Sequence, residues 1–160
     1  MILVLFGTNP YSFDRLAIAI EKYARETKEE IIVQLGNTKY LPKGVKCFRF
    51  LPRKKILQLL ERADIIITQG GFGSIVDALS LRKPTIVVPR KRELNECKDD
   101  GLGQEEVTKE LEKMGLIIAV YNIEDLPYAI EKAKKFKPKF DIMKSEIPKI
   151  ILNFVKKNLK

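Results

Sequence analysis

The chain has 160 residues, of which 45% are hydrophobic, and this length and composition suit one domain with its own core. It contains no histidine, which excludes Ser-His-Asp and Cys-His catalysis. Its net charge of +9 is uneven, because residues 132–160 carry ten lysines against Asp141 and Glu146, which leaves the rest of the chain nearly neutral.

Other compositional features bear on the compartment. Apolar runs such as Met1–Phe6 are far too short to span a bilayer, and residues 1–7 lack the basic region and cleavage site of a signal peptide. Cys47 and Cys97 lack the spacing of a zinc site or a disulfide framework, so we expect two reduced thiols in a cytoplasmic protein that needs no metal and no cofactor. The 32% of charged residues, with no Trp or His, favours a thermophilic source.

Short apolar segments, typical of parallel strands buried on both faces, alternate with segments of helical spacing. In chain order, the sequence predicts a strand at 2–6, a helix at 13–27, strands at 30–35 and 45–51, a helix at 53–62, a strand at 64–68, a helix at 74–81, a strand at 85–88, a helix at 104–114, a strand at 116–120 and helices at 123–136 and 140–158. This order predicts an α/β fold, a single Rossmann-like domain over residues 1–160 with helices on both faces of a parallel sheet. Residues 91–103 are rich in charge and glycine and indicate a long functional or mobile loop.

The most informative segment is the Gly-rich turn Gly70-Gly71-Phe72-Gly73-Ser74, which joins a predicted strand to a predicted helix. A helix N-terminus offers unpaired N–H groups, glycines let a phosphate approach the backbone, and Ser74 is the expected N-cap. The turn lacks the lysine of a Walker A loop, and Val76 stands where a dinucleotide fingerprint has its third glycine. We therefore predict a diphosphate site, the alternative being a tight turn without a ligand.

Further segments accompany this turn in a fixed order. Gly7-Thr8 follows the first strand, Lys83-Pro84 precedes Val87-Val88-Pro89-Arg90, and Gln104 opens a later helix. Together they make residues 1–130 resemble the C-terminal domain of glycosyltransferase family 28. The resemblance extends to its short members, namely the catalytic subunit of the split UDP-GlcNAc transferase of the dolichol pathway and bacterial exopolysaccharide counterparts. It implies the C-terminal, donor-binding half of a GT-B glycosyltransferase.

The resemblance also implies roles for single residues. In the family, the turn binds the diphosphate, an acidic residue in the next helix binds the ribose, and a Gln after the long loop binds the sugar. Those last two positions are Asp77, where many members have Glu, and Gln104. Relatives often have histidine where this chain has Gln69 and Gly103, and Gln69 can form hydrogen bonds but cannot shuttle a proton. The candidate donor-binding residues are Gly7, Thr8, Gln69, Gly70, Gly71, Phe72, Gly73, Ser74, Asp77, Arg90, Gln104 and Glu105.

Alternatives remain for some of these residues. Asp77 could be a surface helix residue, Arg90 could pair with a nearby carboxylate, and Phe72 could be buried or simply exposed. No catalytic residue is assigned. The chain has no Asp-x-Asp motif, and helix dipoles can carry the charge of a leaving diphosphate without a metal.

The resemblance further implies a partner, because a complete GT-B enzyme needs a second Rossmann-like half to hold the acceptor. We expect an inverting transferase that moves a sugar, GlcNAc by the resemblance, from a UDP-sugar to a lipid-linked acceptor. A membrane-anchored, acceptor-binding subunit would place the chain peripherally at the inner face of the membrane. The alternative is a non-catalytic regulatory or stabilising subunit of such a transferase.

The basic C-terminal segment, residues 140–160, is predicted to be helical with one apolar stripe. The stripe consists of Ile147, Ile150, Ile151, Phe154 and Val155. Such a helix could pack on its own domain, dock on a partner or rest on anionic lipid. We expect no nucleic-acid binding, because the segment lacks interleaved aromatic residues and any recognition motif.

Overall fold

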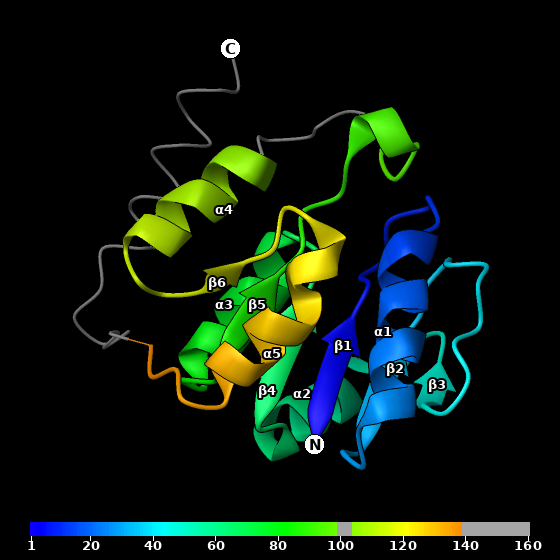
Figure 1. Cartoon of the computed structure of the whole chain (residues 1–160), viewed down its shortest axis with the longest axis horizontal. Coiled ribbons are helices and arrows are strands. Elements are labelled where there is room, and N and C mark those ends of the chain that lie inside the picture. The colour runs from blue at the N-terminus through cyan, green and yellow to red at the C-terminus, as the bar shows by residue number, and fades with distance from the viewer. Residues whose placement is uncertain (99–103, 139–160) are drawn as a thin grey trace.

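The computed structural model describes residues 1–98 and 104–138, in which helices follow strands in the order shown in Figure 1. The strands are β1 (Ile2–Leu5), β2 (Ile31–Gln34), β3 (Lys46–Phe48), β4 (Ile65–Thr68), β5 (Thr85–Val87) and β6 (Ile118–Ala119). The α-helices are α1 (Asp14–Glu26), α2 (Arg53–Arg62), α3 (Phe72–Ser80), α4 (Gln104–Lys113) and α5 (Leu126–Ala133). Two 3₁₀ turns complete the set, η1 (Arg92–Leu94) and η2 (Ile123–Asp125).

The six strands form one parallel sheet in the order β3-β2-β1-β4-β5-β6. The central strand β1 pairs with β2 on one side and β4 on the other, so that Val4 lies between Val33 and Ile67. The chain therefore winds outward from β1 in one direction and from β4 in the other. Ligands of such sheets bind at this switch point, outside the carboxyl ends of the strands.

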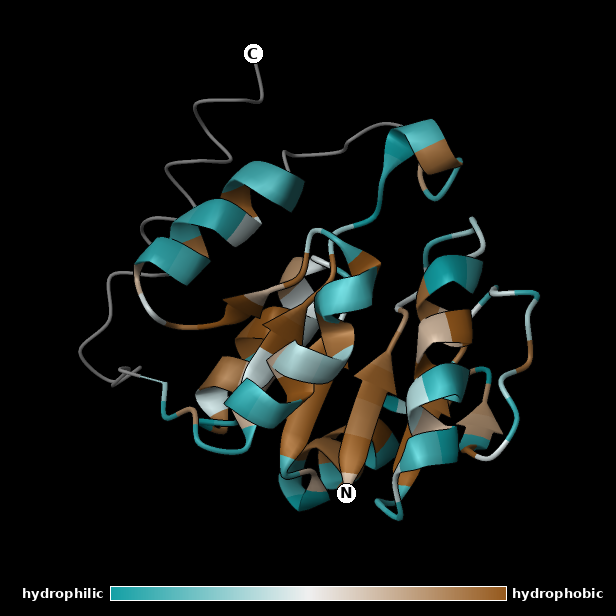
Figure 2. Ribbon diagram, in the orientation of Figure 1, coloured by the Kyte–Doolittle hydropathy of each residue, from teal (hydrophilic) through white to brown (hydrophobic). Residues whose placement is uncertain are grey.

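Helices cover both faces of the sheet, as predicted (Figure 1). Alternate residues of β1 point to opposite faces: Ile2 and Val4 pack under α1 and α5, whereas Leu3 and Leu5 pack against α2 and α3. A further apolar cluster joins α3 to α4. In Figure 2 the strands are almost entirely hydrophobic and the helices are hydrophilic on their outer sides, which explains why the strand segments are continuously apolar in the sequence.

The structure corrects several predicted boundaries. Helix α3 begins at Phe72 with Gly71 as its N-cap, so the prediction that Ser74 caps this helix is wrong. The third strand is shorter than the predicted 45–51, since this edge strand ends at Phe48 before the chain turns toward α2. The predicted 91–103 loop contains η1 and buries Glu96, and the predicted helix 123–136 starts as the 3₁₀ turn η2. The predicted helix 140–158 lies outside the described residues.

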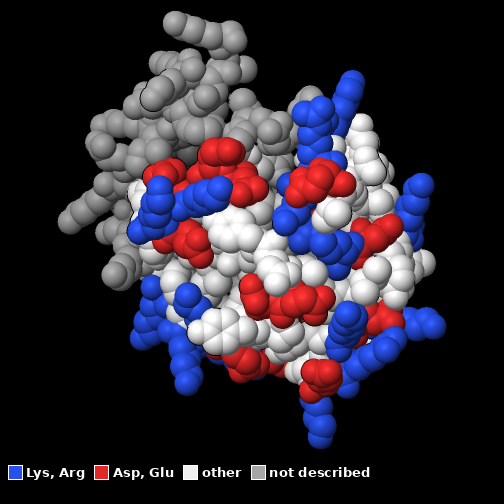
Figure 3. Space-filling view, turned by 45° about the horizontal axis from the view of Figure 1, so that its top comes forward, with Lys and Arg blue, Asp and Glu red and all other residues white. Residues whose placement is uncertain are grey.

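The surface of the described residues carries mixed charge. Lysine and arginine side chains alternate with aspartate and glutamate side chains over the face seen in Figure 3. This mixture agrees with the nearly neutral composition of the chain before residue 132. Within residues 1–98 and 104–138, no helix has the length and apolar character that crossing a membrane requires.

Candidate functional site

Two backbone turns meet at the carboxyl ends of β1 and β4. The turn after β1 contains Gly7, with φ of +71°, and the turn after β4 contains Gly70, with φ of +42°. Both values lie in the left-handed region that side chains other than glycine rarely adopt. A Cβ added at Gly73 would meet no atom within 4 Å, so the first turn of α3 faces open space. The first N–H groups of α3 have no acceptor within the helix, so they are available to an anion in the space between this helix and the turn after β1, here called the crevice.

Gln69 and Arg90 form a buried pair behind the Gly-rich turn. Arg90 is 6% exposed, and its Nε donates a hydrogen bond to Oε1 of Gln69. Its remaining donors reach four backbone carbonyl oxygens, those of Tyr11 at 3.0 Å, Ser12 at 3.1 Å, Glu96 at 2.9 Å and Phe6 at 3.1 Å.

Each nitrogen of the Arg90 guanidinium therefore donates to at least one protein atom. The guanidinium also lies 4.5 Å from the ring centroid of Phe13. Burial lowers the pKa of Arg90 to about 10, which still leaves it charged at neutral pH. Among residues 1–98 and 104–138, Arg90 has no carboxylate side chain as a hydrogen-bond partner, and it joins the turn after β1, the start of α1 and the loop after β5. Arg90 therefore ties together three segments that border the large cavity and the turn after β1.

The pairing with Arg90 fixes which end of the Gln69 amide faces the crevice. A guanidinium has donors only, so it must bind the oxygen of the amide. The Nε2 group consequently lies against Gly7 and Gly71, and a Cβ at Gly71 would be 3.2 Å from it. The crevice is thus presented with an N–H donor, which suits an anionic ligand.

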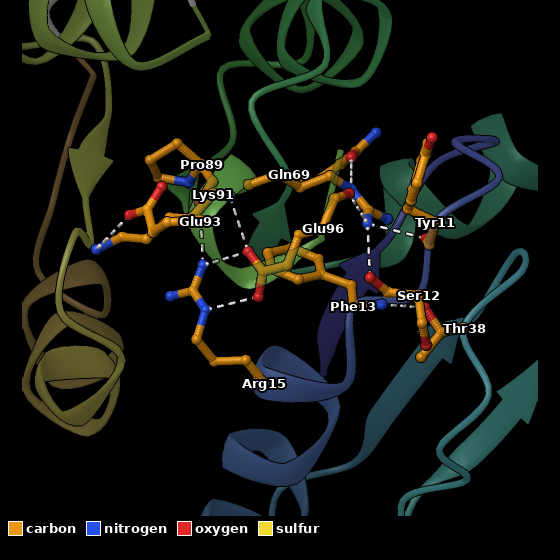
Figure 4. Close-up of polar contacts among 11 residues, drawn as sticks. Tyr11, Ser12, Phe13, Arg15, Thr38, Gln69, Pro89, Lys91, Glu93 and Glu96 are labelled. Carbon is orange, nitrogen blue, oxygen red and sulfur yellow. Dashed lines mark hydrogen bonds and ion pairs between the residues drawn. The ribbon is translucent and has the colours of Figure 1, made fainter. Parts of the chain in front are cut away.

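A second buried pair fixes the loop after β5. Arg15 in α1 donates to both carboxylate oxygens of Glu96, at 2.8 and 2.9 Å, and to the carbonyl oxygen of Pro89 at 3.1 Å (Figure 4). Glu96 also accepts a hydrogen bond from the backbone N–H of Lys91 at 2.9 Å. Glu96 was not predicted from the sequence, because it is one acidic residue within a charged segment and carries no motif of its own.

Asp77, the predicted ribose-binding residue, is held by Arg53. The two Nη atoms of Arg53 each donate to one oxygen of Asp77, both at 2.7 Å. The Asp77 side chain is 15% exposed and that of Arg53 is 66% exposed. Arg53 was also missed from the sequence, where it is only the first residue of a helix that follows Pro52.

A cavity of about 150 Å³, here called the small cavity, opens beside the turn after β1. Two apolar residues of its lining, Phe50 and Leu51, come from the segment after β3. The full lining consists of Leu5, Gly7, Thr8, Gln34, Phe50, Leu51, Ile56 and Ser74. Gln34 fixes its edge, because its side chain accepts a hydrogen bond from the N–H of Gly7 and donates to the carbonyl oxygen of the same residue, both at 2.9 Å. Phe50 is 53% exposed. An aromatic residue directly after a predicted strand is the sequence signal that could have pointed to this cavity.

A cavity of about 550 Å³, here called the large cavity, lies between η1 and the start of α4. It is lined by Arg90, Lys91, Arg92, Glu93, Asn95, Gln104 and Glu105. Gln104 covers Gly70, since a Cβ at Gly70 would lie 3.1 Å from Oε1 of Gln104. This oxygen is buried and has no hydrogen-bond partner among the described residues. Glu105 pairs with Lys109 at 2.7 Å.

The structure therefore gathers most of the predicted residues around the Gly-rich turn. Gly7, Thr8 and Ser74 line the small cavity, and Arg90, Gln104 and Glu105 line the large one. Phe72 differs, because its ring packs partly buried against the cluster between α3 and α4. No group of three Cys, Asp or Glu residues in residues 1–98 and 104–138 could hold a metal ion.

A parallel sheet of this strand order, with a glycine turn and helix N-terminus at its switch point, defines the Rossmann-like class of nucleotide-binding domain. The chain belongs to the glycosyltransferase family 28 C-terminal domain family, whose model matches residues 1–158.

Similar proteins agree with this assignment. The UDP-N-acetylglucosamine transferase subunit ALG13 of Debaryomyces hansenii is 30% identical over 99 residues, which cover 62% of this chain and 43% of that protein. An NMR structure of ALG13 matches 99% of this chain and 96% of its own, with 16% identity and a TM-score of 0.62. The calicheamicin glycosyltransferase CalG4 matches 99% of this chain and 37% of its own, with 14% identity and a TM-score of 0.62. The fold is thus that of the C-terminal half of a GT-B glycosyltransferase, and the chain spans less than half of the length of the curated relatives that it matches.

Proposed function

We propose that this chain is the donor-binding, catalytic subunit of an inverting glycosyltransferase. It transfers GlcNAc from UDP-GlcNAc to a lipid-linked acceptor together with a membrane-anchored partner that binds the acceptor. The observation that carries the proposal is the convergence of the turn after β1, the N-terminus of α3 and Gln104 around Gly70. Family membership and the similarity to a UDP-N-acetylglucosamine transferase subunit support the same reading.

The diphosphate lies between the two glycine turns. The N–H groups of Phe72, Gly73 and Ser74 at the start of α3 donate to it, and the Nε2 group of Gln69 adds a donor from behind. As the acceptor hydroxyl attacks the anomeric carbon from the opposite side, the bond to the diphosphate breaks and negative charge grows on the departing UDP. Fixed N–H donors and the helix dipole stabilise that charge without a metal.

The nucleoside and the sugar lie on opposite sides of the diphosphate. The small cavity suits a pyrimidine base, because Phe50, Leu51 and Ile56 give it apolar walls and Gly7 and Gln34 give it polar edges. Asp77 accepts a hydrogen bond from the ribose. The large cavity takes the sugar, with Gln104 and Glu105 facing its hydroxyl groups.

Gln104 gives the proposal a direct test. Replacing Gln104 with Ala removes hydrogen bonds to the sugar and none to the nucleotide, so we expect affinity for UDP-GlcNAc to fall roughly tenfold and affinity for UDP to stay unchanged. Isothermal titration calorimetry with both ligands measures this difference. No binding of UDP-GlcNAc by the unaltered chain, alone or with its partner, would contradict the proposal.

A turnover assay with the reconstituted pair separates the catalytic role from the regulatory alternative. We expect sugar transfer to the lipid-linked acceptor to fall when Gly73 or Gln104 is replaced. Full activity of both variants would favour a non-catalytic subunit. We further propose that the partner holds the chain at the cytoplasmic face of the membrane, and fractionation with and without the partner tests this location.

A further inference from the structure

The ion pair between Arg53 and Asp77 lies one helical turn away from two residues that line the small cavity. Arg53 lies one turn before Ile56 on α2, and Asp77 lies one turn after Ser74 on α3, and both Ile56 and Ser74 line that cavity. Residues three apart share one face of a helix. The ion pair therefore joins the two helices beside the space in which the proposed nucleotide sits.

The two partners are unequally exposed, and the difference bears on their role. Asp77 is 15% exposed and Arg53 is 66% exposed, so the arginine covers the carboxylate while its own outer side remains in water. Exposed ion pairs usually contribute little to stability, but a bidentate arginine–carboxylate contact is an exception to that rule. With both distances at 2.7 Å, this contact orients the Asp77 carboxylate as well as joining α2 to α3.

The contact leaves the carboxylate able to accept more hydrogen bonds. An ionised carboxylate has about four acceptor positions, and the two Nη atoms occupy one position on each oxygen. One position on each oxygen stays open. The planar fork of the arginine also fixes the plane of the carboxylate, which a single-point contact would not do.

We propose that Arg53 is a positioning residue that fixes the Asp77 carboxylate to accept a hydrogen bond from a ribose hydroxyl, and that it thereby sets a preference for ribonucleotides over deoxynucleotides. The inference rests on the proposed function, because it requires a uridine nucleotide in the small cavity.

The test compares the affinities of UDP, 2′-deoxy-UDP and 3′-deoxy-UDP for the full chain by calorimetry. The unaltered chain is expected to prefer UDP by roughly tenfold over the analogue that lacks the contacted hydroxyl. In Arg53→Ala this ratio falls to about one, and Arg53→Lys, which can hold only one oxygen, retains part of it. Because all three ligands carry the same diphosphate charge, a purely electrostatic effect of Arg53 cancels in the ratio.

Matched variants separate the possible outcomes. Lys54→Ala removes a positive charge from the next position of α2 and should leave the ratio of UDP affinity to deoxy-UDP affinity unchanged. Combining Asp77→Ala with Arg53→Ala should lower this ratio no further than either change alone. Equal weakening of all three ligands by Arg53→Ala, or an unchanged ratio, would overturn the inference and leave the proposed function standing. Equal binding of UDP and both deoxy analogues by the unaltered chain would also overturn the inference and leave the proposed function standing. An unaltered chain that binds none of the three would overturn both.

Discussion

Replacing Arg90 with Ala is expected to lower the free energy of unfolding by about 3 kcal/mol, because the change removes the shared donor of a buried hydrogen-bond network. Four backbone carbonyl oxygens and the side-chain oxygen of Gln69 would lose their donor. Three separate segments meet at this guanidinium, so the crevice should also lose its shape. Urea denaturation followed by circular dichroism measures the change in stability.

A surface arginine provides the control for this variant. Arg62 is exposed in the last turn of α2, and Arg62→Ala is expected to change the free energy of unfolding by less than about 0.5 kcal/mol. Equal stability of Arg90→Ala and Arg62→Ala would show that the Arg90 network does not hold the site together.

Replacing Gln69 with Glu is expected to weaken UDP binding by roughly 100-fold, since it places a negative charge beside the diphosphate in a partly buried site. Arg90 can hold one oxygen of the new carboxylate, as it holds Oε1 of Gln69 now. The other oxygen then replaces the Nε2 group that lies against Gly7 and Gly71. Calorimetry with UDP measures the loss of affinity.

Uridine, which carries no phosphate, is the control ligand for this variant. Its affinity should be the same for the unaltered chain and for Gln69→Glu, and the free energy of unfolding should not fall, because the new carboxylate gains a buried cation as its partner. Unchanged UDP affinity would mean that the Gln69 amide does not face the diphosphate. A matching loss of uridine affinity would mean that the variant distorts the small cavity.

The fold could be predicted because its signals are local. Continuous apolar segments such as Ile65–Ile67 marked the buried strands, and glycines after the strands marked the turns at the carboxyl edge. The N-terminus of α3 was misplaced because Ser is a favourable N-cap by local statistics. Long-range packing of Phe72 on the cluster between α3 and α4 accompanies the earlier start of the helix at Phe72.

The site was predicted less completely, because its side chains are set by partners far away in the sequence. Arg15 pairs with Glu96, 81 positions further along the chain, and Arg53 pairs with Asp77, 24 positions away. No periodicity or motif marks such pairs. Among the residues that the resemblance marked, Gln104 lies over Gly70, and Arg90 lines the large cavity while its guanidinium donates to protein atoms. Their contacts with a donor stay predictions.

The central claim is that a nucleotide diphosphate binds between the turn after β1 and the N-terminus of α3. An NMR titration of ¹⁵N-labelled chain with UDP tests it most directly, because each backbone amide reports on its own surroundings. We expect the largest shifts at the amides of Gly7, Gly70, Gly71, Gly73 and Ser74, with smaller ones at Phe50 and Leu51. Saturable shifts confined to other parts of the chain, or no shifts at all, would contradict the account.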